Sequence, residues 1–187
     1  LIVSPLVSAF GLSWMLMLIG VGVSVLALAG VRRTFVLDRV GAAELDSLAP
    51  IIDLLASLPI LELAQRPAIE QLAKASSVEE VDAGTTVIAQ GEPADDLFAV
   101  MTGELDVDVV DPSGRHQTVA VARVGDYFGE VGLIHSVPRT ATVSARTPAR
   151  LVRVPGAAFL DALSSSPAAW ARALEGATTR LGRQPIS

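Results

Sequence analysis

The spacing of hydrophobic positions changes several times along this chain of 187 residues, and each change marks a different kind of segment. From Leu1 to Val31 no residue is charged, and Trp14–Val31 is an unbroken run of apolar and small residues. A helix over that run is about 27 Å long, close to the thickness of the hydrocarbon core of a bilayer. The pattern therefore predicts a transmembrane helix over Trp14–Val31.

The residues on either side of this run predict how it is oriented. Trp14 stands where an interfacial aromatic is common, and Arg32 and Arg33 supply positive charges of the kind retained on the cytoplasmic side. A signal peptide would carry its charges before the apolar run, and a buried core helix would rarely be free of charge over this length. Leu1–Phe10 resembles the end of a preceding membrane helix. We expect residues 1–33 to be the membrane segment of a multi-pass protein whose soluble part is cytoplasmic.

Helical spacing of apolar residues continues after the arginines. Residues 34–57 form a predicted helical connector, in which Glu44–Ser57 has helical spacing interrupted by Pro50. Pro59 ends that pattern, and a short helix with Pro67 near its start follows. A separate domain is expected over residues 58–187.

From Val78 onward the sequence pattern is typical of strands, because short apolar runs alternate with glycine-rich turns. The predicted strands are Val78–Val81, Thr85–Ala89, Leu97–Met101, Glu104–Val110, Thr118–Arg123, Thr140–Ala145 and Ala149–Val154. Helices are predicted over Ala157–Ser164 and Ala168–Leu181, the second with Pro167 at its start. The sequence thus predicts a mainly β fold, a jelly-roll β-sandwich flanked by N- and C-terminal helices and preceded by the transmembrane helix.

Composition narrows the classes of function. The chain has no cysteine, which excludes disulfides and thiolate metal sites, and its formal net charge of −6 speaks against nucleic acid as a partner. His116 and His135 are its only histidines and form no clustered ligand set, so we expect no metal site. With no nucleophile and base pair evident, we expect no enzyme and no cofactor.

One segment combines groups suited to a phosphorylated sugar. In Phe128–Val143, Gly129 and Gly132 accompany a short helical turn, whose free N–H groups favour an anion. Arg139 offers a planar fork that suits phosphate, and Glu130 offers an acceptor for a sugar hydroxyl. Each residue alone is more often a solvated surface charge. Together they predict a ligand site.

This segment resembles the phosphate-binding cassette of the cyclic nucleotide-binding domain family, in register from Phe128 to Val143. The likeness rests on the Phe-Gly-Glu start, the nine-residue spacing from Glu130 to Arg139, and the Pro-Arg-Thr-Ala-Thr-Val end. Upstream, the stretches Gln90–Phe98 and Gly103–Val107 are similar to strand-turn signatures of the same family. The resemblance covers about residues 58–182.

The resemblance implies roles for particular residues. Arg139 pairs with the ligand phosphate, Glu130 accepts from the ribose 2′-hydroxyl, and Thr140 can reach phosphate or base. The ligand-binding residues that the resemblance implies are Phe128, Gly129, Glu130, Val131, Arg139, Thr140 and Ala141. Apolar walls for the purine are expected from Val119, Val121 and Val143.

Three further expectations concern residues outside this segment. Gly103 is expected to be a turn residue with positive φ. Asp95 and Asp96 are interpreted as solvated loop acids, not a metal pair. Trp170, Leu174 and Leu181 have helical spacing and are expected in the core, although one of them could cap the base instead.

The expected function is a cyclic nucleotide-sensing regulatory domain, with cyclic AMP favoured over cyclic GMP, acting on its own upstream membrane domain. The first two helices and Arg32–Arg33 resemble the last helices of major-facilitator transporters, which favours a secondary transporter in the cell membrane. Two alternatives stay open: the gating domain of a cyclic-nucleotide-gated ion channel, and a soluble cyclic-nucleotide-dependent transcription regulator.

Overall fold

The computed structural model describes residues 48–111 and 113–182. The predicted membrane segment, residues 1–33, and most of the predicted connector lie outside this range. No helix among the described residues is both long and apolar enough to cross a bilayer.

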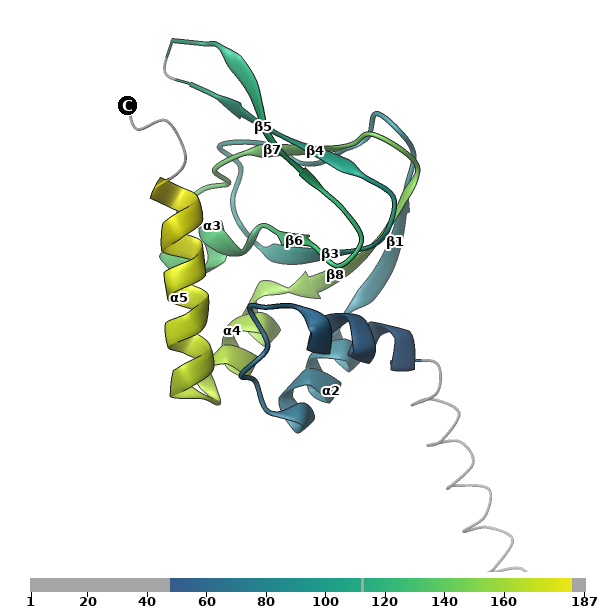
Figure 1. Cartoon of the computed structure of the whole chain (residues 1–187), viewed down its shortest axis with the longest axis vertical. Helices are drawn as coiled ribbons and strands as arrows, with labels where there is room; N and C mark the ends of the chain where they lie inside the picture. Colours follow the sequence, from purple (N-terminus) through teal and green to yellow (C-terminus); the bar gives the residue numbers. More distant parts are fainter. Residues whose placement is uncertain (1–47, 112, 183–187) are drawn as a thin grey trace, which may run out of the picture. The chain divides into compact units, whose positions relative to one another are not determined.

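Eight strands form two antiparallel sheets that face each other (Figure 1). The first sheet has the order β1 (Ser77–Val81), β8 (Ala149–Pro155), β3 (Asp96–Thr102) and β6 (Tyr127–Phe128). The second has the order β2 (Thr86–Ile88), β7 (Thr142–Ala145), β4 (Leu105–Val110) and β5 (His116–Ala122). The predicted two-sheet sandwich with flanking helices is confirmed. Strand β6 was missed because two residues are too short to show any period.

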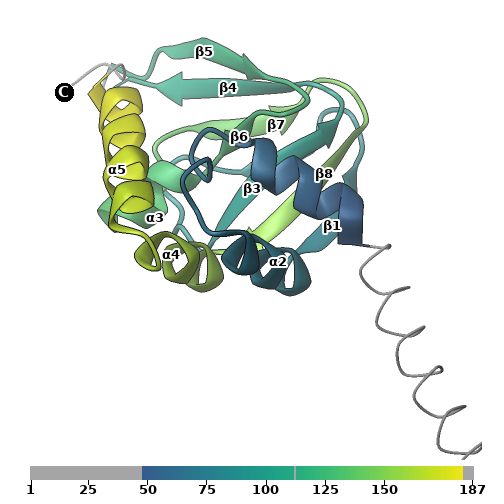
Figure 2. The same ribbon diagram turned by 60° about the horizontal axis from the view of Figure 1, so that its bottom comes forward.

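Helices flank the sandwich on the side of the first sheet. Residues 48–57 are helical, and α2 (Arg66–Ala75) follows with Pro67 in its first turn. The short helix α3 (Glu130–His135) interrupts the strands, and α4 (Gly156–Ser164) and α5 (Pro167–Gly182) end the described chain. Figure 1 shows the helix of residues 48–57, α2 and α4 together below that sheet. Figure 2 shows α5 beside α3. Pro67 and Pro167 both sit at helix starts, where the missing N–H costs nothing.

Strand β3 of the first sheet is buried on both faces, which explains its nearly continuous apolar run. In β8 the exposed Arg150 and Arg153 interrupt the buried apolar residues. Phe98, Val100 and Leu151 point into the space between the sheets, where Phe98 stacks on Phe128 with ring centroids 5.4 Å apart. Leu97 and Val154 point the other way, into the cluster formed with the helices. The structure therefore has an inner β core and a second core under the helices.

The helix of residues 48–57 belongs to that second core. Ile51, Ile52 and Leu55 are buried there beside residues of α2 and α4. These residues lie before residue 58, where the sequence predicts that the domain starts. That boundary stays a prediction. Burial of three aliphatic side chains contributes about 1.5–3 kcal/mol each, so the sandwich relies on this helix for stability.

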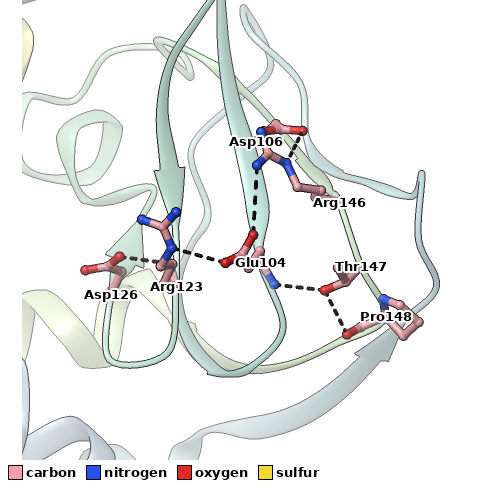
Figure 3. A network of polar contacts seen from close by, with 7 residues as sticks. All are labelled: Glu104, Asp106, Arg123, Asp126, Arg146, Thr147 and Pro148. Atoms are coloured by element: carbon pink, nitrogen blue, oxygen red, sulfur yellow. Dashed lines mark hydrogen bonds and ion pairs between the residues drawn. The ribbon is translucent and has the colours of Figure 1, made fainter.

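A polar network ties three turns together at one end of the sandwich (Figure 3). The Glu104 carboxylate pairs with Arg123 at 3.1 Å, and Arg146 pairs with Asp106 on β4. Thr147 accepts a hydrogen bond from the Glu104 N–H at 3.0 Å. The neighbouring Gly103 has φ +91°, as predicted, and a Cβ there would lie 2.6 Å from that of Ala149.

Candidate functional site

The seven residues predicted to bind ligand all line one cavity of about 340 Å³. Val119 and Val121 of β5 and Val143 of β7 line it too, as expected for apolar walls. The cavity lies where β6, α3 and the segment leading to β7 meet the second sheet. This volume is within the range of small-molecule sites in proteins.

Local backbone geometry forms the first wall of the cavity. Gly129 follows β6 with φ 92° and is the N-cap of α3. A side chain at that φ is strained, so glycine allows the sharp change from strand to helix. Gly132 lies close to the loop before β3, where a Cβ would stand 2.5 Å from that of Ala94. The first turn of α3 is therefore held at the cavity with its N–H groups unpaired within the helix.

Arg139 approaches the same point from the other side. Its backbone is fixed against the turn at residues 91–92, since its N–H donates to the Glu92 carbonyl and its own carbonyl accepts from Gly91, both at 2.8 Å. Its side chain is only 6% exposed, and its Nη1 donates to the Gly129 carbonyl at 2.9 Å. The guanidinium therefore lies at the N-terminal end of α3.

The charge of Arg139 has no close counter-ion among the described residues. No carboxylate there lies within 4.0 Å of its guanidinium. Burial lowers the pKa of the Arg139 guanidinium, and the negative charges of Asp96 and Asp95 oppose that effect. Arginine still remains protonated at any physiological pH. A buried cation without a paired anion is costly, so the cavity is suited to an anionic group.

Glu130 is the second charged group at the cavity, and its side chain is 2% exposed. Burial raises the pKa of its carboxyl, while the positive charge of Arg180 works in the opposite direction. The Arg180 Nη1 donates to Glu130 Oε1 at 2.7 Å. The positive charges of Arg180 and Arg139 favour the charged form of this buried acid, against the effect of burial.

Several residues that line the cavity were not anticipated from the sequence, among them Tyr127 and Arg180. Tyr127 immediately precedes the predicted segment, on the strand that was missed. Arg180 lies in the last turn of α5, where a lone arginine usually stabilises the helix end in solvent. No local pattern distinguishes it from such a residue.

The structure corrects the expected core side of α5. Trp170 and Leu174 are 36% and 40% exposed, and the buried positions are Ala169, Ala173 and Ala177. Small alanines let α5 approach α3 and α4 closely, and larger side chains would hold it away. Neither Trp170 nor Leu174 lines the cavity, so neither caps it. The side chain of Leu181 lies outside the described residues.

Asp96 also differs from its expected role as a solvated acid. It is ion-paired with Arg153 of β8 at 2.6 Å, and Arg153 also pairs with Glu79 of β1 at 3.1 Å. The acid therefore helps to fasten three strands of the first sheet. Within residues 48–111 and 113–182, no group of His, Asp and Glu side chains is arranged to hold a metal ion.

Comparison with known proteins agrees with the expected family. Residues 78–166 match the family model described as cyclic nucleotide-binding domain. The chain is similar to a cAMP-dependent protein kinase regulatory subunit of Yarrowia lipolytica, 46% identical over 67 residues, which cover 36% of this chain and 17% of that protein. It is also similar to a cyclic nucleotide-gated potassium channel of Mesorhizobium japonicum, 32% identical over 114 residues, which cover 61% and 30%.

A solved structure shows the same fold. The regulatory domain of Toxoplasma gondii PKA, crystallised with cAMP, superimposes with a TM-score of 0.66 at 23% identity, over 74% of this chain and 52% of that one. The chain spans less than a third of the length of both curated relatives. The matched segment contains all of β1 except its first residue, β2 to β8, α3 and α4, and thus most of the sandwich and its cavity. Residues 78–166 therefore match the cyclic nucleotide-binding domain family in sequence, and the described residues share the fold of that solved regulatory domain.

Proposed function

We propose that this domain senses a cyclic nucleotide, binds it in the cavity at α3, and regulates a membrane protein. The observation that carries the proposal is the buried Arg139 guanidinium without a paired carboxylate, beside the first turn of α3. A cyclic phosphate supplies the missing anion. It also accepts from backbone N–H groups that the helix itself cannot use.

The proposed contacts divide the ligand among the cavity walls. Arg139 and the N–H groups of Gly129 to Val131 meet the phosphate, and Glu130 accepts from the ribose 2′-hydroxyl. Phe128 and Ala141 complete the wall around the sugar and phosphate, while the apolar side chains of β5 face the purine. A ligand held this way undergoes no reaction, so the proposed role is that of a sensor and not of an enzyme.

Cyclic AMP is the proposed ligand, with cyclic GMP as the weaker one. A guanine-selective pocket needs groups that engage the additional amine and carbonyl of guanine. Glu175, the acid on α5 that the sequence offers, pairs with Arg172 along the helix at 3.7 Å and does not line the cavity. Thr140 lines it and offers a hydroxyl to a guanine amine.

The proposed target is the chain's own upstream membrane domain, in a multi-pass protein of the cell membrane. The apolar run Trp14–Val31 and the following Arg32–Arg33 support this part of the proposal. A secondary transporter is proposed first, on the resemblance to major-facilitator helices. The relative from Mesorhizobium japonicum, a cyclic nucleotide-gated potassium channel, favours a channel as the alternative.

Calorimetric titration of the purified full chain tests the binding proposal. We expect cyclic AMP to bind at micromolar concentration or tighter. Glu175→Gln, which removes an acid outside the cavity, is the control and should bind like the unchanged protein. If neither cyclic AMP nor cyclic GMP produces heat or a shift in melting temperature at millimolar concentration, the proposal is wrong.

A further inference from the structure

A second hollow, of about 720 Å³, lies against the C-terminal half of α3. It is lined from three segments: residues 91–95 before β3, residues 132–138 of α3 and the following turn, and residues 156–160 at the start of α4. We call it the α3–α4 groove, and Figure 2 shows these two helices next to each other. Gly132 is the one described residue that lines both this groove and the cavity of the candidate ligand site. The groove is therefore a neighbour of that cavity with walls of its own.

Close packing at two glycines fixes the shape of the α3–α4 groove. A Cβ on Gly132 would stand 2.5 Å from that of Ala94, and one on Gly156 would stand 2.5 Å from the Leu133 side chain. The Gly156 N–H also donates to the Asp95 carbonyl at 2.8 Å. The three lining segments are thus fastened to one another. A surface formed in advance loses little conformational entropy when a partner binds to it.

The walls of the groove are apolar and open to solvent. Pro93, Pro138 and Ala157 are exposed, and Val137 and Leu160 are half-buried. Apolar side chains exposed together on a protein surface mark sites of interaction. A small molecule in a protein site is usually buried over most of its surface, which walls this open do not provide. A polypeptide segment suits the groove better, because it can lie across the groove and leave at either end.

The charged side chains at the groove are acidic. Asp95 is exposed and lines it, and no Lys or Arg among the described residues does. Asp161 is exposed and follows Ala157 by one turn of α4, so it lies on the same helix face. Within residues 48–111 and 113–182, neither carboxylate has a basic side chain within 4.0 Å. The groove therefore offers two acids with which a cationic partner can pair.

Arg139 attracts Asp95 electrostatically, but its guanidinium belongs to the other cavity. The Arg139 side chain is 6% exposed, and its Nη1 donates to the Gly129 carbonyl. It does not line the groove. The exposed Asp95 carboxylate is therefore left for a partner that approaches from solvent.

We propose that the α3–α4 groove is a docking site for a segment of another protein in which apolar side chains stand next to Lys or Arg. The apolar side chains pack on Val137, Pro138 and Leu160, and the cations pair with Asp95 and Asp161. Nucleic acid and anionic lipid are disfavoured there, because their phosphates would meet the same two carboxylates. This site is separate from the proposed nucleotide function, and its occupation requires no nucleotide.

Binding of a labelled peptide to the full chain, without nucleotide, tests the proposal. The probe is a short fluorescein-labelled peptide of Leu, Val and Arg, and the comparison peptide has Glu in place of each Arg. We expect fluorescence anisotropy to show binding of the Arg peptide. The Glu peptide should bind at least about tenfold more weakly, because its charges repel those of the groove.

Two pairs of variants test where the peptide binds. Ala157→Arg places a long cation in the groove and should weaken binding of the Arg peptide at least about tenfold. Ala171→Arg adds the same side chain at an exposed position of α5 outside the groove, and affinity should stay as in the unchanged protein. Asp161→Asn removes one pairing partner and should weaken binding about two- to fivefold. Asp82→Asn, at an exposed acid between β1 and β2, is its control and should leave binding unchanged.

Thermal unfolding shows whether each variant is folded, and the aspartate pair decides the test if Ala157→Arg does not fold. A photo-crosslinking form of the Arg peptide, mapped by mass spectrometry, should label residues 91–95, 132–138 and 156–161. Labels confined to other segments, equal binding of the two peptides, or equal weakening by each variant and its control would overturn the proposal. Self-association of the full chain that Ala157→Arg abolishes would make a second copy the occupant, and would overturn it as well.

Discussion

The Gly129 carbonyl and the Arg139 guanidinium are in direct contact, with 2.9 Å between the oxygen and Nη1. A Cβ added to Gly129 would stand 2.6 Å from that same nitrogen, on a backbone with φ +92°. The residue that turns the chain into α3 thus also leaves the room in which Arg139 lies. One glycine therefore determines both the backbone conformation at the start of α3 and the space that the Arg139 guanidinium occupies.

The first prediction follows from this contact. Gly129→Ala should lower the free energy of unfolding by about 1–3 kcal/mol, because a side chain is forced into the left-handed region. It should also weaken cyclic AMP binding at least tenfold, because the Cβ displaces the guanidinium. Thermal unfolding and calorimetry measure the two effects.

Gly84→Ala is the matched control for that variant. Gly84 has φ +84°, yet a Cβ there would meet nothing within 4 Å. Gly84→Ala should therefore also lower the free energy of unfolding, and it should leave the affinity for cyclic AMP unchanged. Equal loss of affinity in both variants would contradict the proposed displacement of Arg139.

Arg139→Met should separate binding from stability. It removes the fork that meets the phosphate, and a charge-assisted hydrogen bond contributes about 1.5–3 kcal/mol, so affinity should fall about 10- to 150-fold. The melting temperature of the protein without nucleotide should stay equal or rise, since a buried cation lacking a paired carboxylate is replaced by an apolar chain of similar length.

Arg146→Met serves as the control for the arginine change. Arg146 is ion-paired with Asp106 at the surface and lies outside the cavity. It should leave affinity as in the unchanged protein. Binding of cyclic AMP by folded Arg139→Met within threefold of the unchanged protein would show that the phosphate lies elsewhere.

Competition between the two nucleotides tests the proposed preference. Thr140→Ala should leave cyclic AMP affinity within about threefold, because adenine does not depend on that hydroxyl, and should weaken cyclic GMP more. Paired titrations of both nucleotides against both proteins measure the difference. Tighter binding of cyclic GMP by the unchanged protein, lost selectively in Thr140→Ala, would reverse the proposed order.

A prediction about acid stability concerns the turn between β4 and β5. The Asp111 carboxylate accepts from the Ser113 hydroxyl and N–H and from the Arg115 N–H. These hydrogen bonds, that of the Ser113 hydroxyl foremost, lower the pKa of Asp111 from 3.8 to about 2. Because the folded pKa is the lower one, the stabilisation is present above about pH 4 and is lost as pH falls toward 2.

Thermal unfolding between pH 2 and pH 6 measures this contribution. Asp111→Asn should remove it, so the variant is less stable near pH 6 and the difference narrows toward pH 2. Asp161→Asn, a change at an exposed acid of α4, is the control. A constant difference between the unchanged protein and Asp111→Asn across that range would rule out the assigned role.

Much of the fold and of the site could be predicted because the features involved are local in sequence. Glycines with positive φ mark turns such as those at Gly103 and Gly125, and they divided the chain into seven of the eight strands. The segment from Phe128 to Val143 contains its own turn, helix and arginine. Glu130 and Arg139 lie only nine residues apart in this segment. That both line one cavity could therefore be predicted from the segment itself.

Tertiary structure alone decided how α5 meets this site. Both sides of α5 carry apolar residues. The alanines are the buried ones because their small side chains allow closer packing than Trp170 and Leu174 would. Arg180 and Glu130 lie 50 residues apart, and no pattern along the chain relates them. Their ion pair exists because the fold removes Glu130 from water and positions the last turn of α5 beside it. Burial and partner geometry are properties of the assembled layers, so they could not be predicted from local spacing.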